Sequence, residues 1–241
     1  TKAGTYTVLK NVCPILMKKH EITILTNTNI DIDCHKLIQL KSWFFPLPKY
    51  SFMPGLITLV NSGKLDDYDV IHIFEYPLFA TDYLTYKKNN IKTPIIISMH
   101  GSLHQSAKFP ISIFKKIHNS IMLRYQNNIS TFLASTMAEK SHIIKYGIPE
   151  NKVKLLTLGV NIPKINRVEP SRKNILYLGR LAVTKNVDIL LNAFSLLKND
   201  EADLIIAGPD FGVLKKLKKI TQDLGLKNKV FFKNKVSEKE K

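Results

Sequence analysis

The stretch ILYLGRLAVTKNVDILLNAFSLLK, residues 175–198, carries the clearest structural pattern in this chain. A short apolar run ends at Gly179, and an amphipathic segment of helical length begins near Val187, after a loop that contains Arg180 and Lys185. A buried strand followed by a loop and a helix is the repeating unit of a parallel α/β sheet. Ligands bind such sheets at the carboxyl ends of the strands. Gly179, Arg180 and Lys185 therefore stand at a candidate binding position.

The same alternation of strands and helices extends in both directions from this stretch. Apolar runs bounded by polar or turn-forming residues predict strands at 21–26, 68–74, 94–100, 131–135, 152–158, 174–179, 202–208 and 229–233. Amphipathic periodicity predicts helices at 5–19, 51–65, 78–88, 137–146, 187–197 and 213–224, and a further helix opened by Pro110. In the first helix Val8, Leu9, Val12, Ile15 and Leu16 fall on one face, and in the helix after Pro110 the apolar stripe is Ile113, Phe114, Ile117 and Ile121.

The chain divides into two Rossmann-like α/β units, because a polar segment with two prolines interrupts the periodicity. We predict an N-terminal unit at 1–160, a linker at 161–173 and a second unit at 174–241. A doubly wound sheet usually opens with a strand, whereas this chain opens with a helix, and the second unit ends after three strands. We therefore expect that the first strand and the rest of the second unit are missing.

Composition restricts the class of protein without naming a partner. The 241 residues carry a net charge of +17, and 32 of the 36 basic residues are lysines. Proteins that recognise nucleic-acid bases and phosphates rely on arginine, and no nucleic-acid-binding motif is visible in this sequence. Three explanations of the positive charge remain open: a solvated lysine-rich surface, an anionic membrane or phosphate-bearing partner, and a nucleic-acid partner. The two cysteines form neither a disulfide framework nor a metal motif, which favours a reducing cytoplasm.

The motifs of the second unit resemble the donor-binding domain of family 4 glycosyltransferases, the "glycosyl transferases group 1" of GT-B fold. That family has a strand, Gly-Arg, a Lys a few residues later, and a helix with an LL-AF pattern, as in residues 178–194 here. Further segments match in the same order, at 158–161 (LGVN), 204–209 (LIIAGP) and 229–236 (KVFFKNKV). This sequence departs from the family pattern at Leu158, Asn161 and Asn234, where Asn, Asp and Gly are usual. The resemblance covers nearly the whole chain and is clearest in the second unit.

The resemblance implies a site for the diphosphate of a nucleotide-sugar donor. Arg180 and Lys185 would hold the diphosphate, with Gly179 beside them, and the donor would lie between the two units. Gly4 resembles the second glycine of the family's Gly-Gly loop near the donor phosphates. The resemblance places Gly208 and Val236 near the nucleobase. From spacing alone, an ordinary basic loop remains the alternative for Arg180 and Lys185.

His100-Gly101 resembles the family motif that faces the reacting sugar, which implies that His100 is a catalytic residue orienting the sugar or the acceptor. A structural histidine at a strand end is the alternative. His72 lies inside a predicted buried strand and is interpreted as structural, and Glu75 follows that strand on the acceptor side. His100 and His104 have i, i+4 spacing, but Gly101 disfavours a helix and no third ligand is visible, so no metal is expected.

The function implied is a retaining glycosyltransferase of polysaccharide biosynthesis. It would move a sugar from a nucleoside-diphosphate sugar to a hydroxyl of a glycan or lipid-linked acceptor, with no cofactor. The alternatives are an epimerase of GT-B fold and a non-catalytic module that binds anionic membranes or nucleic acid. The family's Glu-x7-Glu motif would fall beyond Lys241, so we expect this chain to turn over little. Residues 211–241 carry ten lysines against three acidic residues, consistent with a cytoplasmic protein that contacts the inner membrane face peripherally.

Overall fold

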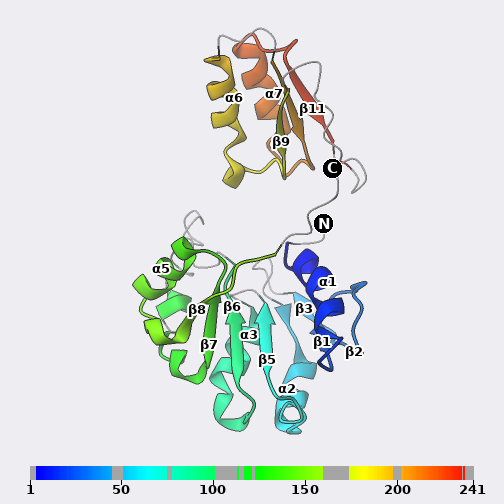
Figure 1. The fold of residues 1–241 in the computed structure, drawn as a ribbon, viewed down its shortest axis with the longest axis vertical. Coiled ribbons are helices and arrows are strands. Elements are labelled where there is room, and N and C mark those ends of the chain that lie inside the picture. Colours follow the sequence, from blue (N-terminus) through cyan, green and yellow to red (C-terminus); the bar gives the residue numbers. More distant parts are fainter. Residues whose placement is uncertain are drawn as a thin grey trace. The chain divides into compact units, whose positions relative to one another are not determined.

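The computed structural model describes residues 4–44, 51–74, 78–100, 113, 117–120, 123–159, 174–197, 202–234 and 236. Contacts divide the chain into two compact units, Thr1–Asn161 and Ile162–Lys241 (Figure 1). Each unit has its own hydrophobic core. The division falls within the segment that the sequence predicts as a linker, and residues 160–173 lie outside the described part.

The main sheet of the first unit has four parallel strands in the order β5-β6-β7-β8 (Figure 1). Their bounds are Ile71–Phe74 for β5, Ile95–Ser98 for β6, Thr131–Ala134 for β7 and Val153–Leu155 for β8. Ile95 and Ile97 of β6 are almost completely buried, as expected for a central strand of a parallel sheet. The predicted strands at 68–74, 94–100, 131–135 and 152–158 are therefore confirmed, each shorter than predicted.

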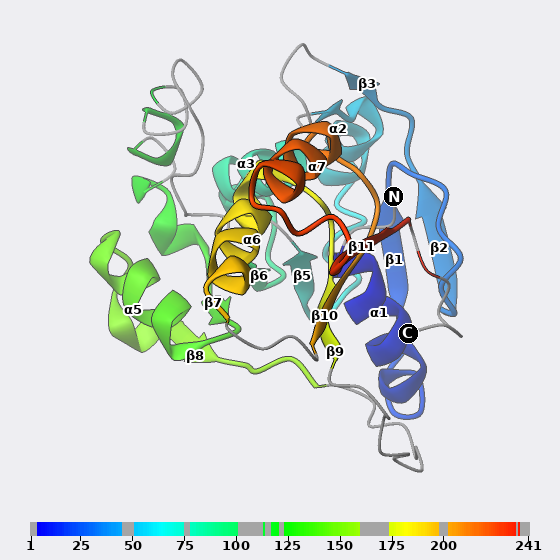
Figure 2. The same ribbon diagram turned by 90° about the horizontal axis from the view of Figure 1, so that it is seen from above.

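Helices pack against this sheet and supply the rest of its core. They are α2 (Pro54–Asn61), α3 (Phe79–Tyr86) and α5 (Met137–Lys145), with 3-10 turns η1 (Lys88–Asn90), η2 (Gln126–Asn128) and η3 (Glu150–Lys152). α5 lies beside β7 and β8 (Figure 2). Pro54 opens α2, where its missing N–H costs nothing. Of the helix predicted after Pro110, residues 113 and 117–120 are described as helical, and Ile113 and Ile117 are exposed.

A smaller group of elements completes the first unit. α1 (Gly4–Leu16) precedes β1 (Thr23–Thr26), which pairs in parallel with β2 (Lys36–Gln39). β3 (Trp43–Phe44) and β4 (Ser51–Phe52) form a short antiparallel pair. Cys13, Ile24 and Ile32 form the buried cluster of this region.

The apolar face predicted for α1 is only partly correct. Leu9 packs against the small cluster, but Val12, Ile15 and Leu16 are exposed. Cys13 is the one buried residue of α1. The periodicity identified the helix, but the short β1-β2 pair provides too little surface to cover the whole predicted stripe.

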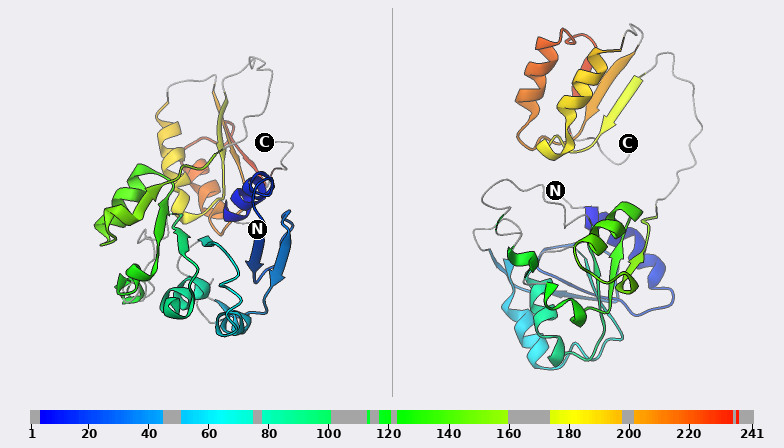
Figure 3. Two further views of the ribbon diagram at one scale, coloured as in Figure 1. Left: turned by 60° about the horizontal axis from the view of Figure 1, so that its bottom comes forward. Right: turned by 90° about the vertical axis from the view of Figure 1, so that its left-hand side faces the viewer.

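The second unit is a three-stranded parallel sheet in the order β11-β10-β9. The strands are β9 (Asn174–Leu178), β10 (Asp203–Ala207) and β11 (Val230–Lys233), and the helices are α6 (Val187–Ser195) and α7 (Leu214–Asp223). Both helices lie on one face of the sheet (Figures 1 and 3), against Leu204 and Ile206. On the opposite face Leu176 and Phe231 remain 59% and 45% exposed.

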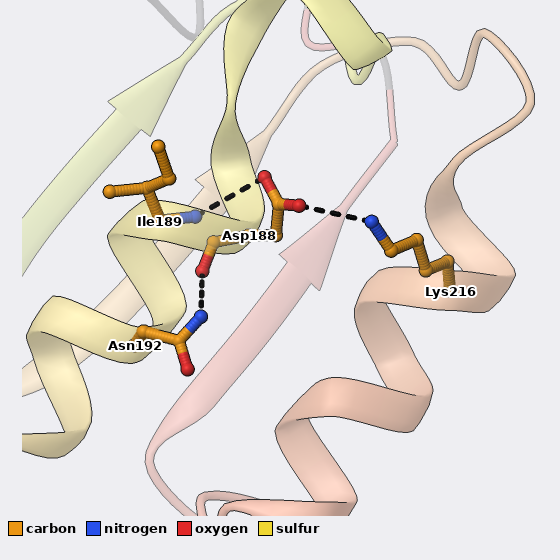
Figure 4. A network of polar contacts seen from close by, with 4 residues as sticks. All are labelled: Asp188, Ile189, Asn192 and Lys216. Atoms are coloured by element: carbon orange, nitrogen blue, oxygen red, sulfur yellow. Dashed lines mark hydrogen bonds and ion pairs between the residues drawn. The ribbon is translucent and has the colours of Figure 1, made fainter.

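A polar contact joins the two helices of the second unit (Figure 4). Lys216 Nζ of α7 donates to Asp188 Oδ2 of α6 at 3.0 Å, and Asp188 Oδ1 accepts from the Ile189 N–H at 3.2 Å. Asn192 Nδ2 donates to the Asp188 carbonyl at 2.8 Å. The hydrogen bond from Lys216 is the main cause that lowers the pKa of Asp188. An exposed ion pair of this kind contributes only about 0.2–1 kcal/mol to the free energy of unfolding.

No helix in the described part of the chain is both long enough and apolar enough to cross a bilayer.

Candidate functional site

In the second unit, the end of β9 is held against the end of β10 by an unusually close backbone approach. Gly208 has φ +152°, and a Cβ added there would lie 1.8 Å from the Gly179 carbonyl oxygen. Only glycine fits this position, because both the backbone angle and the space exclude a side chain. The contact places the start of the Gly179-Arg180 loop directly beside the loop that follows β10.

Arg180 follows Gly179 with its main chain fixed and its side chain exposed. The Tyr177 hydroxyl donates to the Arg180 carbonyl at 3.0 Å, and Leu181 forms a parallel bridge with Asp210. Burial raises the pKa of Tyr177, and the Arg180 charge opposes that rise. The Arg180 guanidinium carbon lies 5.4 Å from the centre of the Phe211 ring, within cation–π distance. None of the described carboxylates forms an ion pair with Arg180, so its charge is available to an anion.

Lys185 lies at the end of the 3-10 turn η4 (Val183–Lys185), immediately before α6. The next residue, Asn186, is in the left-handed conformation with φ +49° and makes no side-chain cap to α6. This conformation, which Asn tolerates better than most residues, turns the chain from η4 into the helix. Lys185 is exposed, and no carboxylate of the described residues pairs with it. The structure therefore places Lys185 at a helix N-terminus, a position that favours negative charge.

Asp210 was missed by the sequence analysis and occupies the N-terminus of α7. Its Oδ1 accepts from the backbone N–H groups of Gly212, Val213 and Leu214 at 2.9–3.0 Å. These N–H groups, that of Leu214 first, lower the pKa of Asp210. An Asp just before an apolar-periodic segment is a recognised helix-start signal and could have identified it. Asp210 thus satisfies the backbone donors at the start of α7.

Val236 is described as half-buried, three residues beyond β11.

In the first unit, His100 has two unusual features. Its backbone adopts φ +46°, which is uncommon for any residue other than glycine. Its Nε2 atom is buried, with no hydrogen-bond partner in the described part of the chain. Strained backbone and unsatisfied buried polar groups concentrate at functional sites. The ring stacks on Phe74, with centroids 5.9 Å apart and an interplanar angle of 17°.

His72 does not occupy the buried position that the sequence predicts. It is exposed, because the core-facing side of β5 is formed by Ile71 and Ile73, on the opposite face of the strand. Its Nε2 nevertheless forms a 2.8 Å hydrogen bond with Ser98 Oγ, and its ring packs on Phe74 at 4.1 Å. Desolvation of the ring and, to a lesser extent, the charge of His100 lower the pKa of His72 to about 4.

Gly4 is the first residue of α1 and is exposed. No atom lies within 4 Å of a Cβ built there, so packing does not require glycine at this position. Glu75, Gly101, His104, Val160 and Asn161, which the sequence analysis also named, lie outside the described residues.

A small cavity lies in the first unit. It has a volume of about 30 Å³ and lies in the core beside α3, β6 and β7, lined by Thr85, Ile97, Asn119 and Phe132 among others. No group of three or more His, Cys, Asp or Glu side chains among the described residues could hold a metal ion.

The sequence matches two neighbouring family descriptions. Residues 3–164 match "Glycosyltransferase Family 4", and residues 161–241 match "Glycosyl transferases group 1". A putative glycosyltransferase, YtcC of Bacillus subtilis, is 24% identical over 184 residues, which cover 68% of this chain and 42% of YtcC. The uncharacterized glycosyltransferase MJ1607 of Methanocaldococcus jannaschii is 26% identical over 186 residues, covering 70% of this chain and 47% of the relative. The chain thus spans less than half the length of these curated relatives.

Solved structures share the fold at low sequence identity. Anabaena HepE, in complex with UDP and glucose, has a TM-score of 0.69 and 16% identity, over 98% of this chain and 67% of HepE. The lipopolysaccharide outer core galactosyltransferase WaaB has a TM-score of 0.67 and 19% identity, over 98% of this chain and 65% of WaaB. WaaG, a glycosyltransferase involved in lipopolysaccharide biosynthesis, has a TM-score of 0.61 and 15% identity, over 96% of this chain and 66% of WaaG.

The predicted α/β fold of GT-B type is confirmed by these structures and by the parallel sheets of both units. The two family matches together run from residue 3 to residue 241, and the chain therefore belongs to glycosyltransferase family 4, with a glycosyl transferases group 1 domain as its second unit.

Proposed function

We propose that this chain is the part of a retaining glycosyltransferase that binds a nucleoside-diphosphate-sugar donor, with the acceptor being a hydroxyl of a glycan or a lipid-linked glycan. The observation that carries the proposal is the pair of exposed cations, Arg180 and Lys185, that follow β9 without a carboxylate partner among the described residues. Both lie in one short segment between a strand end and a helix N-terminus. That arrangement suits a diphosphate.

The proposed chemistry of the second unit is electrostatic. When the glycosidic bond to the donor breaks, negative charge grows on the departing diphosphate, and fixed cations stabilise it. The planar guanidinium of Arg180 would form two parallel hydrogen bonds to phosphate oxygens, while Lys185 would act as a point charge. Two such side chains supply the charge that a divalent ion provides elsewhere, so the proposed reaction requires no cofactor. Gly179 would let the diphosphate approach the main chain, and Gly208 holds that main chain in place.

In the first unit, His100 would hydrogen-bond to a hydroxyl of the donor sugar or of the acceptor. Its buried Nε2 without a partner among the described residues supports this role. Gly4, at the exposed start of α1, would contribute backbone N–H groups near the donor phosphates. For Val236 we propose a backbone contact with the nucleobase.

UDP is the first probe to test, because HepE was solved in complex with UDP and with UDP-glucose. Calorimetric titration of UDP into the chain should show binding that Arg180→Ala and Lys185→Ala each weaken about ten- to a hundredfold, the range for loss of a hydrogen bond to a charged group. Arg180→Lys should recover part of the loss. Lys215→Ala, which removes an exposed cation from α7, is the matched control and should leave the affinity unchanged.

Equal UDP affinity in the wild type and in both alanine variants would overturn the assignment of this site. The stereochemistry is tested separately with the full-length enzyme. A product with the anomeric configuration of the donor supports the retaining transferase, whereas release of an epimerised free sugar in the absence of acceptor supports the epimerase alternative.

A lipid-linked acceptor would place the enzyme at a membrane surface on the cytoplasmic face, with the second unit making the contact. The specific observation is α7, where Lys215, Lys218 and Lys219 are exposed without an ion-pair partner in the described residues. The apolar residues of α7, by contrast, pack into the second unit. A lysine-rich face of this kind attracts anionic lipid headgroups.

A further inference from the structure

The topology brings three residues, His72, Phe74 and Ser98, close together beside His100. β5 and β6 are parallel neighbours, with Phe74 opposite Ser98 in register. Residues two apart on a strand point to the same face of a sheet. His72 and Phe74 therefore share a face of β5, and Ser98 lies on the same face of β6, two residues before His100.

On that face, three rings pack in a row with Phe74 in the middle, here called the ring stack: His100 is stacked on Phe74, and His72 is tilted by 34° against Phe74. The ring centroids of His72 and Phe74 are 4.1 Å apart, and those of Phe74 and His100 are 5.9 Å apart. Both separations are those of aromatic rings in contact. The ring planes of Phe74 and His100 differ by only 17°, so the two rings lie nearly parallel to each other.

The far end of the stack is anchored by a hydrogen bond. His72 Nε2 and Ser98 Oγ are 2.8 Å apart, which ties the first ring of the stack on β5 to the strand that leads to His100. Desolvation of the ring and the charge of His100 lower the pKa of His72 to about 4. The His72 ring is therefore neutral at physiological pH and packs as an uncharged aromatic ring.

The orientation of the His100 ring depends on these contacts, because the backbone of His100 has an unusual conformation. At φ +46° the residue is in a sparsely populated region, and its Nε2 has no hydrogen bond to any described residue that would fix the ring. A ring in this situation is oriented by the surface on which it packs. The described residue that provides this surface is Phe74.

We infer that Phe74 and His72 are positioning residues for His100: the ring stack on β5, anchored through Ser98, fixes the His100 ring and so directs its buried Nε2. The functional meaning of this arrangement rests on the proposed role of His100 toward a sugar or acceptor hydroxyl. The positioning itself is a property of the protein without ligand. A simple packing role for Phe74 predicts that any apolar side chain of similar volume would serve, whereas positioning by a stack requires an aromatic ring.

The test is proton NMR of the histidine rings in the chain without ligand. The His100 Cε1–H signal is identified by its loss in His100→Gln. It should lie upfield in the wild type, because Phe74 shields it, and should stay there in Phe74→Tyr, which keeps the ring. In Phe74→Leu, which keeps an apolar side chain, it should move downfield toward the position of a histidine in an unfolded chain. His72→Leu should shift it partway. A His100 signal that is identical in wild type and Phe74→Leu would overturn the inference.

Circular dichroism checks that each variant is folded, and Phe74→Tyr keeps the test valid if Phe74→Leu unfolds: loss of the upfield signal in the folded Tyr variant also overturns the inference. A second readout separates the positioning from the proposed function. The ratio of UDP-glucose affinity to UDP affinity should fall in His100→Gln and in Phe74→Leu, and recover in Phe74→Tyr. A ratio that His100→Gln leaves unchanged, with the NMR shifts as expected, removes the proposed sugar contact while the ring positioning stands.

Discussion

Gly208 shows how a single missing side chain lets two strand ends meet beside the proposed diphosphate site. Its backbone lies against Gly179, so main-chain packing, together with the hydrogen bond from the Tyr177 hydroxyl to the Arg180 carbonyl, positions the loop that carries Arg180. The sequence identified both glycines, because each ends an apolar run. The contact between them depends on the register of β9 against β10, which spacing along the chain does not reveal.

Gly208→Ala should destabilise the second unit by at least about 3 kcal/mol, since the new Cβ would overlap the Gly179 carbonyl and the residue would also be strained at φ +152°. Gly212→Ala is the matched control, because Gly212 also has a positive φ, +89°, but has open space around it. It should cost only the backbone strain, about 1 kcal/mol. Differential scanning calorimetry measures both. Equal losses in the two variants would show that the close approach is not present in solution.

The His118–Asp82 pair is the other residue-scale feature with a measurable consequence. His118 Nε2 lies 2.7 Å from Asp82 Oδ2, and the two side chains are 27% and 15% exposed. Burial disfavours the charged ring, but the hydrogen bond and the charge of Asp82 outweigh it and raise the pKa of His118. A raised folded-state pKa gives stability that is complete below the unfolded value, near 6.5, and is lost as the pH rises through the folded value.

Asp82→Asn should therefore lower the free energy of unfolding by roughly 1–2 kcal/mol in mildly acidic buffer, and by less in alkaline buffer. Urea unfolding at several pH values provides the measurement. The control is Glu150→Gln, which breaks the 3.2 Å pair with Lys140 where Glu150 is 72% exposed. That change should cost less than about 0.5 kcal/mol. A loss for Asp82→Asn that grows with pH would contradict the assigned direction of the shift.

At the scale of elements, α5 begins at a well-formed cap that the sequence contains but that periodicity alone did not resolve. Thr136 Oγ1 accepts from the Glu139 N–H at 3.1 Å, and Glu139 Oε2 accepts from the Ser135 N–H at 2.7 Å. The two side chains thus satisfy backbone donors on both sides of the helix start. α5 packs on β7 and β8, so a frayed first turn would loosen that contact.

Thr136→Ala should lower the free energy of unfolding by about 1 kcal/mol, the usual cost of removing a Thr cap, whereas Thr136→Ser should stay within a few tenths. The comparison is made by urea denaturation, with the slope of the unfolding curve required to match in all three proteins. If alanine and serine behave alike, the hydroxyl does not cap α5.

The elements that the sequence predicted correctly share a physical cause. Every strand of the four-stranded and the three-stranded parallel sheet is a run rich in apolar residues between turn signals, because at least one face of each sheet packs against helices. β2 was not predicted, since it has no fully buried residue and its sequence KLIQ has no strand periodicity. β3 and β4 have two residues each, too few for any pattern.

At the scale of the whole molecule, the candidate residues of the second unit were more predictable than those of the first. Arg180 and Lys185 lie in one short loop, so chain spacing is close to spatial arrangement. The support of His100 comes instead from His72 and Phe74 on the neighbouring strand, and only the register of β5 against β6 brings them together. His72 was therefore interpreted from its strand alone, and its place in the ring stack was missed.

The net charge of +17 is a property of the whole chain, so a test of membrane contact must separate a specific lysine face from general attraction. We expect the chain to bind vesicles containing phosphatidylserine, and replacement of Lys215, Lys218 and Lys219 by glutamine to weaken partitioning at least about tenfold at low salt, since each lysine near an anionic surface contributes about 1 kcal/mol. The matched control replaces Lys18, Lys19 and Lys36, which are equally exposed in the first unit, and removes the same charge. Vesicle pelleting across a salt series measures both variants, because screening should abolish the difference. Equal weakening in the two triple variants would assign the binding to net charge, and an absence of binding by the wild type would remove the membrane proposal altogether.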